Sequence, residues 1–351
     1  MTDTFFLGVD LGSTKTHALL SNAVGQALGA GQSGPGNHEV VGYAGFRQNL
    51  NQAVQQALNI AGITVDQIRG AGFGVSGFDW PCELQPTLDV IQSLHLNAPI
   101  EVVNDAVPGI VAAARDGWGL AVVSGTGCNC WGRDSTHTRL GHVTGGGVNF
   151  GEAAGASEII HRSIQQVAYQ YTGRGPQTCL SEMYMQLTGS ASLEDLLAGL
   201  SMGNFSIPPS AAPLIFQAAE QDDAVALQLL DWAGCELGEL ANAVIRQLNF
   251  EDLEFDVVLT GSFFNGGALL INPMQSKIHS LAPCARLVRL KHPPVIGAVM
   301  MGMQKSGLAI DPNIRKRLQE SVSGFLTLPQ PLPDAPLNSV GINHCGEGQG
   351  F

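Results

Sequence analysis

The feature that most constrains the fold is a polar turn that directly follows a short apolar run and recurs later in the chain. The first copy begins with an apolar run at residues 5–10, which ends in Asp10, and continues through a segment of glycine and hydroxyl residues. Apolar runs follow at residues 17–20 and 27–30. Short apolar runs separated by turn residues are typical of strands joined by hairpins. This part of the sequence therefore predicts three consecutive antiparallel strands.

The same pattern restarts at residue 119. An apolar run over residues 119–123 ends in Ser124-Gly125-Thr126-Gly127, and the sequence predicts further strands at 129–133 and 136–142. The spacing exceeds the period of roughly 20–50 residues found in solenoid proteins, so it indicates two similar lobes that face one another.

Helices and single strands are expected after each three-stranded unit. Apolar residues at intervals of three and four precede Gly62, which predicts a helix over residues 41–61 with a glycine stop. The other predicted strands are 68–75, 100–103 and 255–260, the last of the chain, and the other predicted helices are 106–114, 153–171, 193–200 and 213–248.

The composition limits the partners. The chain has 351 residues, enough for two domains, and carries 17 Lys and Arg against 30 Asp and Glu, a net charge of −13. Such a surface repels nucleic acids and anionic lipids, so neither is expected as a partner. The sequence has no run of about 18 apolar residues and no signal-peptide pattern. The seven cysteines lack framework spacing, which indicates a reducing compartment and hence the cytoplasm.

Both polar turns are candidate anion-binding loops. A tight turn after a buried strand exposes successive N–H groups that can cradle an anion. In the first turn, residues 14–16 add hydroxyl and ammonium donors, and Asp10 is suited to hold Mg²⁺ through water. The alternative is an ordinary hairpin turn with solvated polar residues. Two such loops at matching positions favour the binding hypothesis.

The order of the motifs resembles that of a known superfamily. The two turns, Val103-Asn104-Asp105-Ala106 and Leu259-Thr260-Gly261-Ser262 are similar to the phosphate, connector and adenosine motifs of the actin/hexokinase/Hsp70 ATPases. Gly34-Pro35-Gly36-Asn37-His38 and Ser124-Gly125-Thr126-Gly127-Cys128-Asn129-Cys130 resemble the BadF/BadG/BcrA/BcrD ATPase family, which includes N-acetylglucosamine kinases. The resemblance runs from about residue 7 to residue 302.

This resemblance implies an α/β fold with two ribonuclease H-like, actin-like ATPase lobes and a cleft between them. The expected lobes are residues 1–116 and 117–306, with the last helix able to pack back onto the first lobe. Residues 307–351 are expected to form a tail that is partly extended or disordered and Pro-rich at 328–340. The resemblance also implies a homodimer, ATP and Mg²⁺ as cofactors, and a small sugar as substrate.

The resemblance assigns residues to ATP, to the base and to the sugar. ATP would contact Asp10, Gly12, Ser13, Thr14, Lys15, Thr16, Ser124, Gly125, Thr126, Gly127, Gly261 and Ser262. The sugar would contact Asn37, His38, Ser76, Gly77, Asn104, Cys128, Asn129 and Glu152. Each of these sugar residues except Glu152 could instead be a structural turn residue, and Glu152 could instead stabilise the start of the following helix.

Asp105 is the candidate catalytic residue. It lies between a predicted strand and a predicted helix, where its carboxylate could accept the proton of a sugar hydroxyl. The alternative is an N-cap role, and the two roles are compatible. Glu152 departs from the family, which has Gly-Asp-Glu-Gly-Ser where this chain has Gly151-Glu152-Ala153-Ala154-Gly155. This difference concerns the identity of the sugar more than the type of reaction.

Two other patterns do not indicate sites. Gly72-Phe73-Gly74-Val75-Ser76-Gly77 matches the dinucleotide fingerprint, but it leads into Phe78-Asp79-Trp80-Pro81 rather than into a helix. Cys128 and Cys130 have no further metal ligands at a useful spacing, so we expect small buried cysteines. His142 and His161 are expected to be structural.

The function expected from the resemblance is ATP-dependent phosphorylation of N-acetylglucosamine to its 6-phosphate. Phosphorylation of glucosamine or another hexose is one alternative. An ATPase activator of a radical dehydratase is an alternative of another class, although its cluster-binding cysteine motif is not found in this chain. A sugar sensor without turnover is a third, although no DNA-binding segment is evident.

Overall fold

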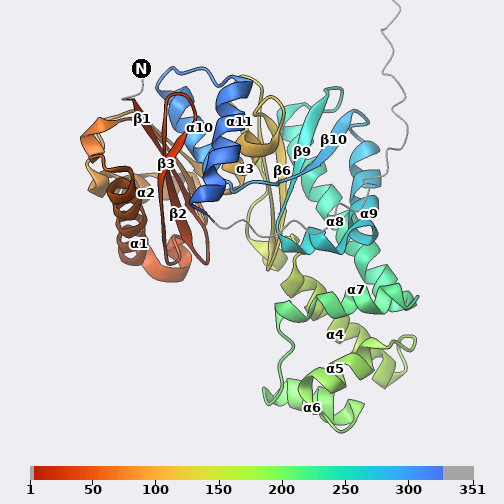
Figure 1. The fold of residues 1–351 in the computed structure, drawn as a ribbon. Coiled ribbons are helices and arrows are strands. Elements are labelled where there is room, and N and C mark those ends of the chain that lie inside the picture. Colours follow the sequence, from red (N-terminus) through yellow and green to blue (C-terminus); the bar gives the residue numbers. More distant parts are fainter. Residues whose placement is uncertain (1–3, 327–351) are drawn as a thin grey trace, which may run out of the picture.

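The computed structural model describes residues 4–326, and Figure 1 shows their arrangement in two sheets with helices around them. The first sheet has five strands in the order β3-β2-β1-β4-β5. The first three are antiparallel, whereas β4 and β5 are parallel to β1. The strands are β1 (Phe5–Leu11), β2 (Thr16–Asn22), β3 (Ala27–Ser33), β4 (Ile68–Val75) and β5 (Ile100–Asn104).

The second sheet has the same design. Its order is β10-β9-β6-β7-β8, again with three antiparallel strands followed by two parallel ones. The strands are β6 (Gly119–Ser124), β7 (Cys128–Arg133), β8 (Leu140–His142), β9 (Phe255–Thr260) and β10 (Ala285–Arg289). The predicted α/β class and the repetition of the three-stranded unit are therefore confirmed. The strand at 255–260 is not the last one, because β10 follows.

Helices cover the outer faces of the sheets and fill the space between them. The helices next to the first sheet are α1 (His38–Ala61), α2 (Leu84–Ile91), α3 (Ala106–Ala113), α10 (Val295–Lys305) and α11 (Pro312–Ser321). Those of the second half are α4 (Ala156–Thr172), α5 (Leu180–Thr188), α6 (Leu193–Met202), α7 (Pro213–Glu220), α8 (Ala224–Leu248) and α9 (Ala268–His279). No helix of the described residues is long and apolar enough to cross a bilayer.

The central core joins the two sheets. Helix α10 packs on β1 and β4, while α3 contacts strands of both sheets. Buried residues from both halves meet here, among them Phe6, Val107, Ala121 and Met300. Arg133 of β7 also forms an ion pair across the lobes with Glu101 of β5 at 3.1 Å.

The glycines of β4 allow α10 to lie close to the sheet. A Cβ atom on Gly72 would lie 2.1 Å from the Ala298 carbonyl oxygen, and one on Gly70 would lie 2.2 Å from that of Gly302. These glycines belong to or adjoin the segment that matches the dinucleotide fingerprint. The structure gives Gly70 and Gly72 a packing role.

Helices α4 to α7 extend away from the second sheet (Figure 1).

The helix predicted at 213–248 divides into α7 and α8, because Asp222 is left-handed (φ 59°) and Asp223 caps α8 through Ala226 N–H. The strand predicted at 136–142 shortens to β8, since the Asp134 carboxylate accepts hydrogen bonds from the Thr138 and Arg139 N–H groups and holds a turn.

The domain boundaries at 116/117 and 306/307 stay predictions. The predicted tail includes α11, and its Pro-rich segment at 328–340 lies outside the described residues.

Candidate active site

The first polar turn follows β1 and presents its donors to solvent. Gly12 N–H bonds to the Lys15 carbonyl at 2.9 Å, and Ser13, Thr14 and Lys15 are exposed. Thr16 is buried instead, and its hydroxyl donates to the Gly34 carbonyl at 2.9 Å. Its side chain therefore holds the neighbouring loop in this structure.

Three side chains from separate segments converge beside this turn. Ser13 Oγ lies 3.0 Å from Ser76 Oγ, and the Asn37 amide reaches both hydroxyls at 3.3 and 3.4 Å. Asn37 also caps α1 by accepting from Glu39 N–H at 2.7 Å. Gly77 lies directly against Asn37 and is left-handed (φ 79°), so a side chain there would be strained and would clash. The structure thus brings the first turn together with two of the predicted sugar segments.

Two carboxylates lie at the carboxyl ends of β1 and β5. The pKa of Asp10 is raised to about 7, mainly by burial and also by the negative charge of Asp105. The positive charge of Lys15 opposes this rise with a smaller effect. Burial likewise raises the pKa of Asp105 to about 6, opposed by a hydrogen bond with Ser76. Asp105 starts α3, but its side chain makes no capping hydrogen bond, and Ala106 N–H donates to Asn104 Oδ1 instead. The Asp105 carboxylate is therefore not committed to the N-cap role.

Mg²⁺ fits beside this pair of acids. Two buried carboxylates that repel one another are stabilised by a cation, and oxygen is the ligand type that Mg²⁺ prefers. Within residues 4–326, no group of three or more His, Cys, Asp or Glu side chains could form a metal site of their own. Asp10 would hold the ion together with water, because Mg²⁺ usually keeps part of its hydration shell.

The second polar turn joins β6 to β7 and lies against the start of α4. Gly125 N–H bonds to the Gly127 carbonyl at 2.9 Å, while Thr126 and Gly127 are exposed. The carbonyls of Gly125 and Thr126 accept from Ala156 and Ser157 N–H at 2.9 Å each.

The adenosine motif adjoins this turn. Gly261 is left-handed (φ 109°), and a Cβ atom on it would lie 2.1 Å from the Ser124 carbonyl oxygen. Gly261 and Ser262 are both exposed. The structure thus places these two predicted nucleotide segments side by side.

Glu152 is buried on the second lobe and keeps one free carboxylate oxygen. Its Oε1 accepts hydrogen bonds from the backbone and hydroxyl of Thr144, the latter at 2.8 Å. Its Oε2 is buried and has no hydrogen-bond partner. A buried carboxylate oxygen without a partner is costly, so it indicates a place for a donor group of a ligand.

The remaining predicted sugar residues have structural contacts as well. His38 stacks on Tyr43 with ring centroids 4.7 Å apart and lies 3.6 Å from the Glu83 carboxylate. Cys128 accepts a hydrogen bond from Ala154 N–H at 3.3 Å, and burial raises the pKa of its thiol to about 12. This thiol is therefore neutral at physiological pH.

Asp79 is a site residue that the sequence analysis missed. It lies in the segment after β4, and its Oδ1 accepts from the Asn104 amide at 3.0 Å. Burial raises its pKa to about 6, and a hydrogen bond from the Asn129 side chain opposes this increase. The segment Phe78-Asp79-Trp80-Pro81 entered the sequence analysis only as evidence against a dinucleotide fingerprint. An acid after a β-strand and next to Ser76 and Gly77 was the available signal.

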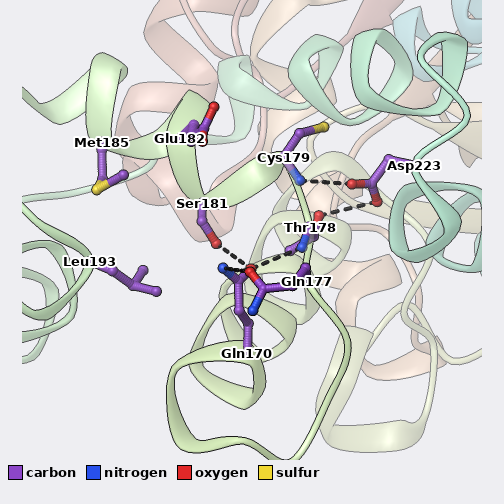
Figure 2. A pocket seen from close by; sticks show the side chains of 9 residues that line it. All are labelled: Gln170, Gln177, Thr178, Cys179, Ser181, Glu182, Met185, Leu193 and Asp223. Atoms are coloured by element: carbon purple, nitrogen blue, oxygen red, sulfur yellow. Dashed lines mark hydrogen bonds between the residues drawn. The ribbon is translucent and has the colours of Figure 1, made fainter.

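A separate pocket of about 490 Å³ lies among α4, α5 and the start of α8, far from these loops in the sequence (Figure 2). Its polar groups bond to one another: Gln170 Oε1 accepts from Thr178 N–H and the Ser181 hydroxyl, and Asp223 accepts from Cys179 N–H and the Thr178 hydroxyl. These contacts join the helices and leave no buried donor or acceptor for a ligand.

Comparisons with known proteins agree with this arrangement. The model of the BadF/BadG/BcrA/BcrD ATPase family matches residues 7–302. The chain is 23% identical to the N-acetylmuramic acid/N-acetylglucosamine kinase of Clostridium acetobutylicum, with 85% of this chain and 97% of that protein aligned. It is 24% identical to the N-acetyl-D-glucosamine kinase of Dictyostelium discoideum, with 86% and 99% aligned.

Among solved structures, one similar chain comes from Chromobacterium violaceum and is described as a candidate N-acetylglucosamine kinase. The TM-score is 0.62 at 22% identity, with 85% of this chain and 98% of that chain covered. At this identity the likeness concerns the fold.

Proposed function

Because the chain belongs to the BadF/BadG/BcrA/BcrD ATPase family, we propose that it is an ATP-dependent kinase of an amino sugar. N-acetylglucosamine is the proposed acceptor and its 6-phosphate the product. The observation that carries the proposal is the convergence of Asp10, Ser13, Ser76 and Asp105 at the ends of β1, β4 and β5 with Asn37 at the start of α1. This arrangement combines an anion-binding turn with a carboxylate that can act as a base.

In the proposed reaction, Asp105 accepts the proton of the acceptor hydroxyl as the γ-phosphoryl group is transferred. A base works best when its pKa lies near the working pH, and the pKa of Asp105 is about 6. At neutral pH this carboxylate is largely ionised and able to accept a proton. The interaction with Ser76 lowers its pKa and so favours the ionised form.

The two polar turns would hold the phosphates through their exposed N–H and hydroxyl groups, with the Lys15 ammonium beside them. Gly261 and Ser262 would border the nucleotide next to the second turn. Mg²⁺ bound near Asp10 would neutralise charge on the phosphates. The chain's own contribution is therefore to orient the polyphosphate and to hold the base.

The sugar would lie between the Asn37–Ser76 network of one lobe and Asn129 and Glu152 of the other. Carboxylate and amide groups accept and donate the hydrogen bonds that sugar hydroxyls require. Glu152 Oε2, buried without a partner, is the strongest support for a polar ligand here. Glucosamine is the second candidate, because several carboxylates surround this end of the cleft and would tolerate an ammonium group.

A panel assay tests the proposal directly. ADP release should be measured with MgATP and N-acetylglucosamine, glucosamine, N-acetylmuramic acid, glucose and N-acetylmannosamine, and the product position assigned by NMR. We expect the highest kcat/KM with N-acetylglucosamine. If none of these sugars is phosphorylated, the proposal is refuted. A brown purified protein that contains iron would instead support a dehydratase activator. Cytoplasmic location and a homodimer remain predictions.

A further inference from the structure

Asp79 has no part in the proposed reaction, yet it lies where the two lobes meet. Its carboxylate accepts from the Asn104 amide of the first lobe at 3.0 Å. From the second lobe, the Asn129 side chain lies near enough to oppose the rise in the pKa of this carboxyl. Gly145 approaches it as well, since a Cβ atom there would lie 2.8 Å from Asp79 Oδ2. One carboxylate therefore contacts both lobes.

The backbone around Asp79 is fixed by a second acid. Glu83 Oε2 accepts hydrogen bonds from the N–H groups of Asp79 and Trp80 at 2.9 and 2.8 Å. These bonds hold the segment in a turn ahead of α2. The backbone that carries the Asp79 carboxylate is therefore held by two hydrogen bonds to Glu83.

Asn104 links Asp79 to the proposed base. The Asn104 side chain is buried, and while its amide donates to Asp79, its carbonyl oxygen accepts from Ala106 N–H at 2.9 Å. Asp105 lies between these two backbone positions. An asparagine amide can be turned either way, and the carboxylate acceptor at Asp79 selects the orientation in which Oδ1 faces the start of α3.

The Asn129 amide of the other lobe is also oriented by a backbone hydrogen bond. Its Oδ1 accepts from Cys130 N–H at 2.8 Å, which leaves its NH₂ group facing Asp79. Asp79 therefore accepts a hydrogen bond from the Asn104 amide of the first lobe and has the Asn129 amide of the second lobe near it. An ionised carboxylate has acceptor sites for both, whereas an asparagine in its place would offer one acceptor oxygen and one unwanted donor.

We propose that Asp79 is a positioning residue that sets Asn104 and Asn129 across the cleft and so fixes the width of the sugar site. This inference rests on the proposed function. It assigns Asp79 no contact with the reacting atoms. Its effect reaches the sugar through Asn129 and the base through Asn104.

The test is a double-mutant cycle with Asp79→Asn, Asn129→Ala and the combined variant. Kinetics are measured with MgATP and N-acetylglucosamine, each varied in turn. Asp79→Asn is nearly isosteric and should raise KM for the sugar about tenfold while KM for ATP changes by less than about twofold. In the Asn129→Ala background the same substitution should have a much smaller effect on the sugar KM.

Asp134→Asn is the matched control. Asp134 is a buried acid of the second lobe whose carboxylate holds the turn before β8. It should lower the melting temperature and leave both KM values unchanged. If Asp79→Asn behaves in the same way, or if its effect on the sugar KM is undiminished without Asn129, the inference is wrong.

Melting temperatures of the same variants keep the test independent of activity. If Asp79 and Asn129 interact, the combined variant should lose less stability than the sum of the two single losses. If the parent phosphorylates no sugar, the proposed function fails and this thermal cycle alone decides the inference. Additive losses would then overturn it.

Discussion

Replacement of Asp10 by asparagine should stabilise the protein at neutral pH. The pKa of this carboxyl is raised from 3.8 to about 7, first by burial and then by Asp105. The folded protein thus binds this proton more tightly than the unfolded chain does. The stability from this group is fully present below about pH 4 and is lost as the pH rises through about 7.

The magnitude follows from the shift. Three pKa units at 1.36 kcal/mol each correspond to about 4 kcal/mol at pH 7. Asparagine removes the charge and keeps the shape, but it leaves a polar amide in the same buried position. We therefore expect the free energy of unfolding to rise by about 2–4 kcal/mol at pH 7 in the absence of Mg²⁺.

The assay is thermal unfolding of parent and variant in EDTA between about pH 4 and pH 8. The difference in melting temperature should be small at the acidic end and should grow with pH. Asp89→Asn, an exposed acid on α2, is the control and should show no such trend. Mg²⁺ with a nucleotide should then stabilise the parent more than the variant. A difference that is absent or independent of pH would refute the reasoning.

Asp105→Asn should lower kcat at least about 100-fold and leave ATP binding intact, as measured by turnover and calorimetry, because the amide cannot accept the proton; turnover within about threefold of the parent would exclude it as the base. Glu152→Gln should raise KM for the sugar about tenfold without affecting KM for ATP, and Glu152→Asp should have a smaller effect; unchanged KM values with a small loss of thermal stability would indicate only a helix-terminus role. Gly72→Ala should destabilise the protein by about 3 kcal/mol in denaturant unfolding, since its Cβ would meet the backbone of α10. Gly324→Ala, where a Cβ meets nothing, should be neutral.

Much of the fold could be predicted from the sequence because the repeated unit is local. Apolar runs separated by polar turns form β1 to β3 and β6 to β7 without help from distant residues. The last helix of the second half was expected to pack back onto the first lobe, but its range was not predicted. Helix α10 carries glycines because it packs closely against its neighbours, among them β4, so its pattern does not indicate one exposed face. The break at Asp222 similarly depends on a single left-handed residue, which periodicity cannot reveal.

The site was predicted in outline for a similar reason. Asp10 ends one predicted strand and Asp105 closely follows another, and parallel strands bring such ends to one edge of a sheet. Asp79 had a sequence signal, as an acid after a strand and next to Ser76 and Gly77, but its approach to Gly145 on the other lobe is visible only in the structure. Thr16 was predicted to contact ATP from its place in the motif. The sequence did not indicate that its hydroxyl donates a hydrogen bond to the Gly34 carbonyl.

The position of α10 has a consequence for the order in which the molecule is made. The helix spans residues 295–305, yet it packs on a face of the sheet whose first strand starts at residue 5. On the ribosome, that face must wait until nearly the whole second lobe has emerged. The first lobe is therefore translated first but cannot complete its packing first. Until α10 is synthesised, this face of the sheet stays exposed unless a chaperone or another part of the chain covers it.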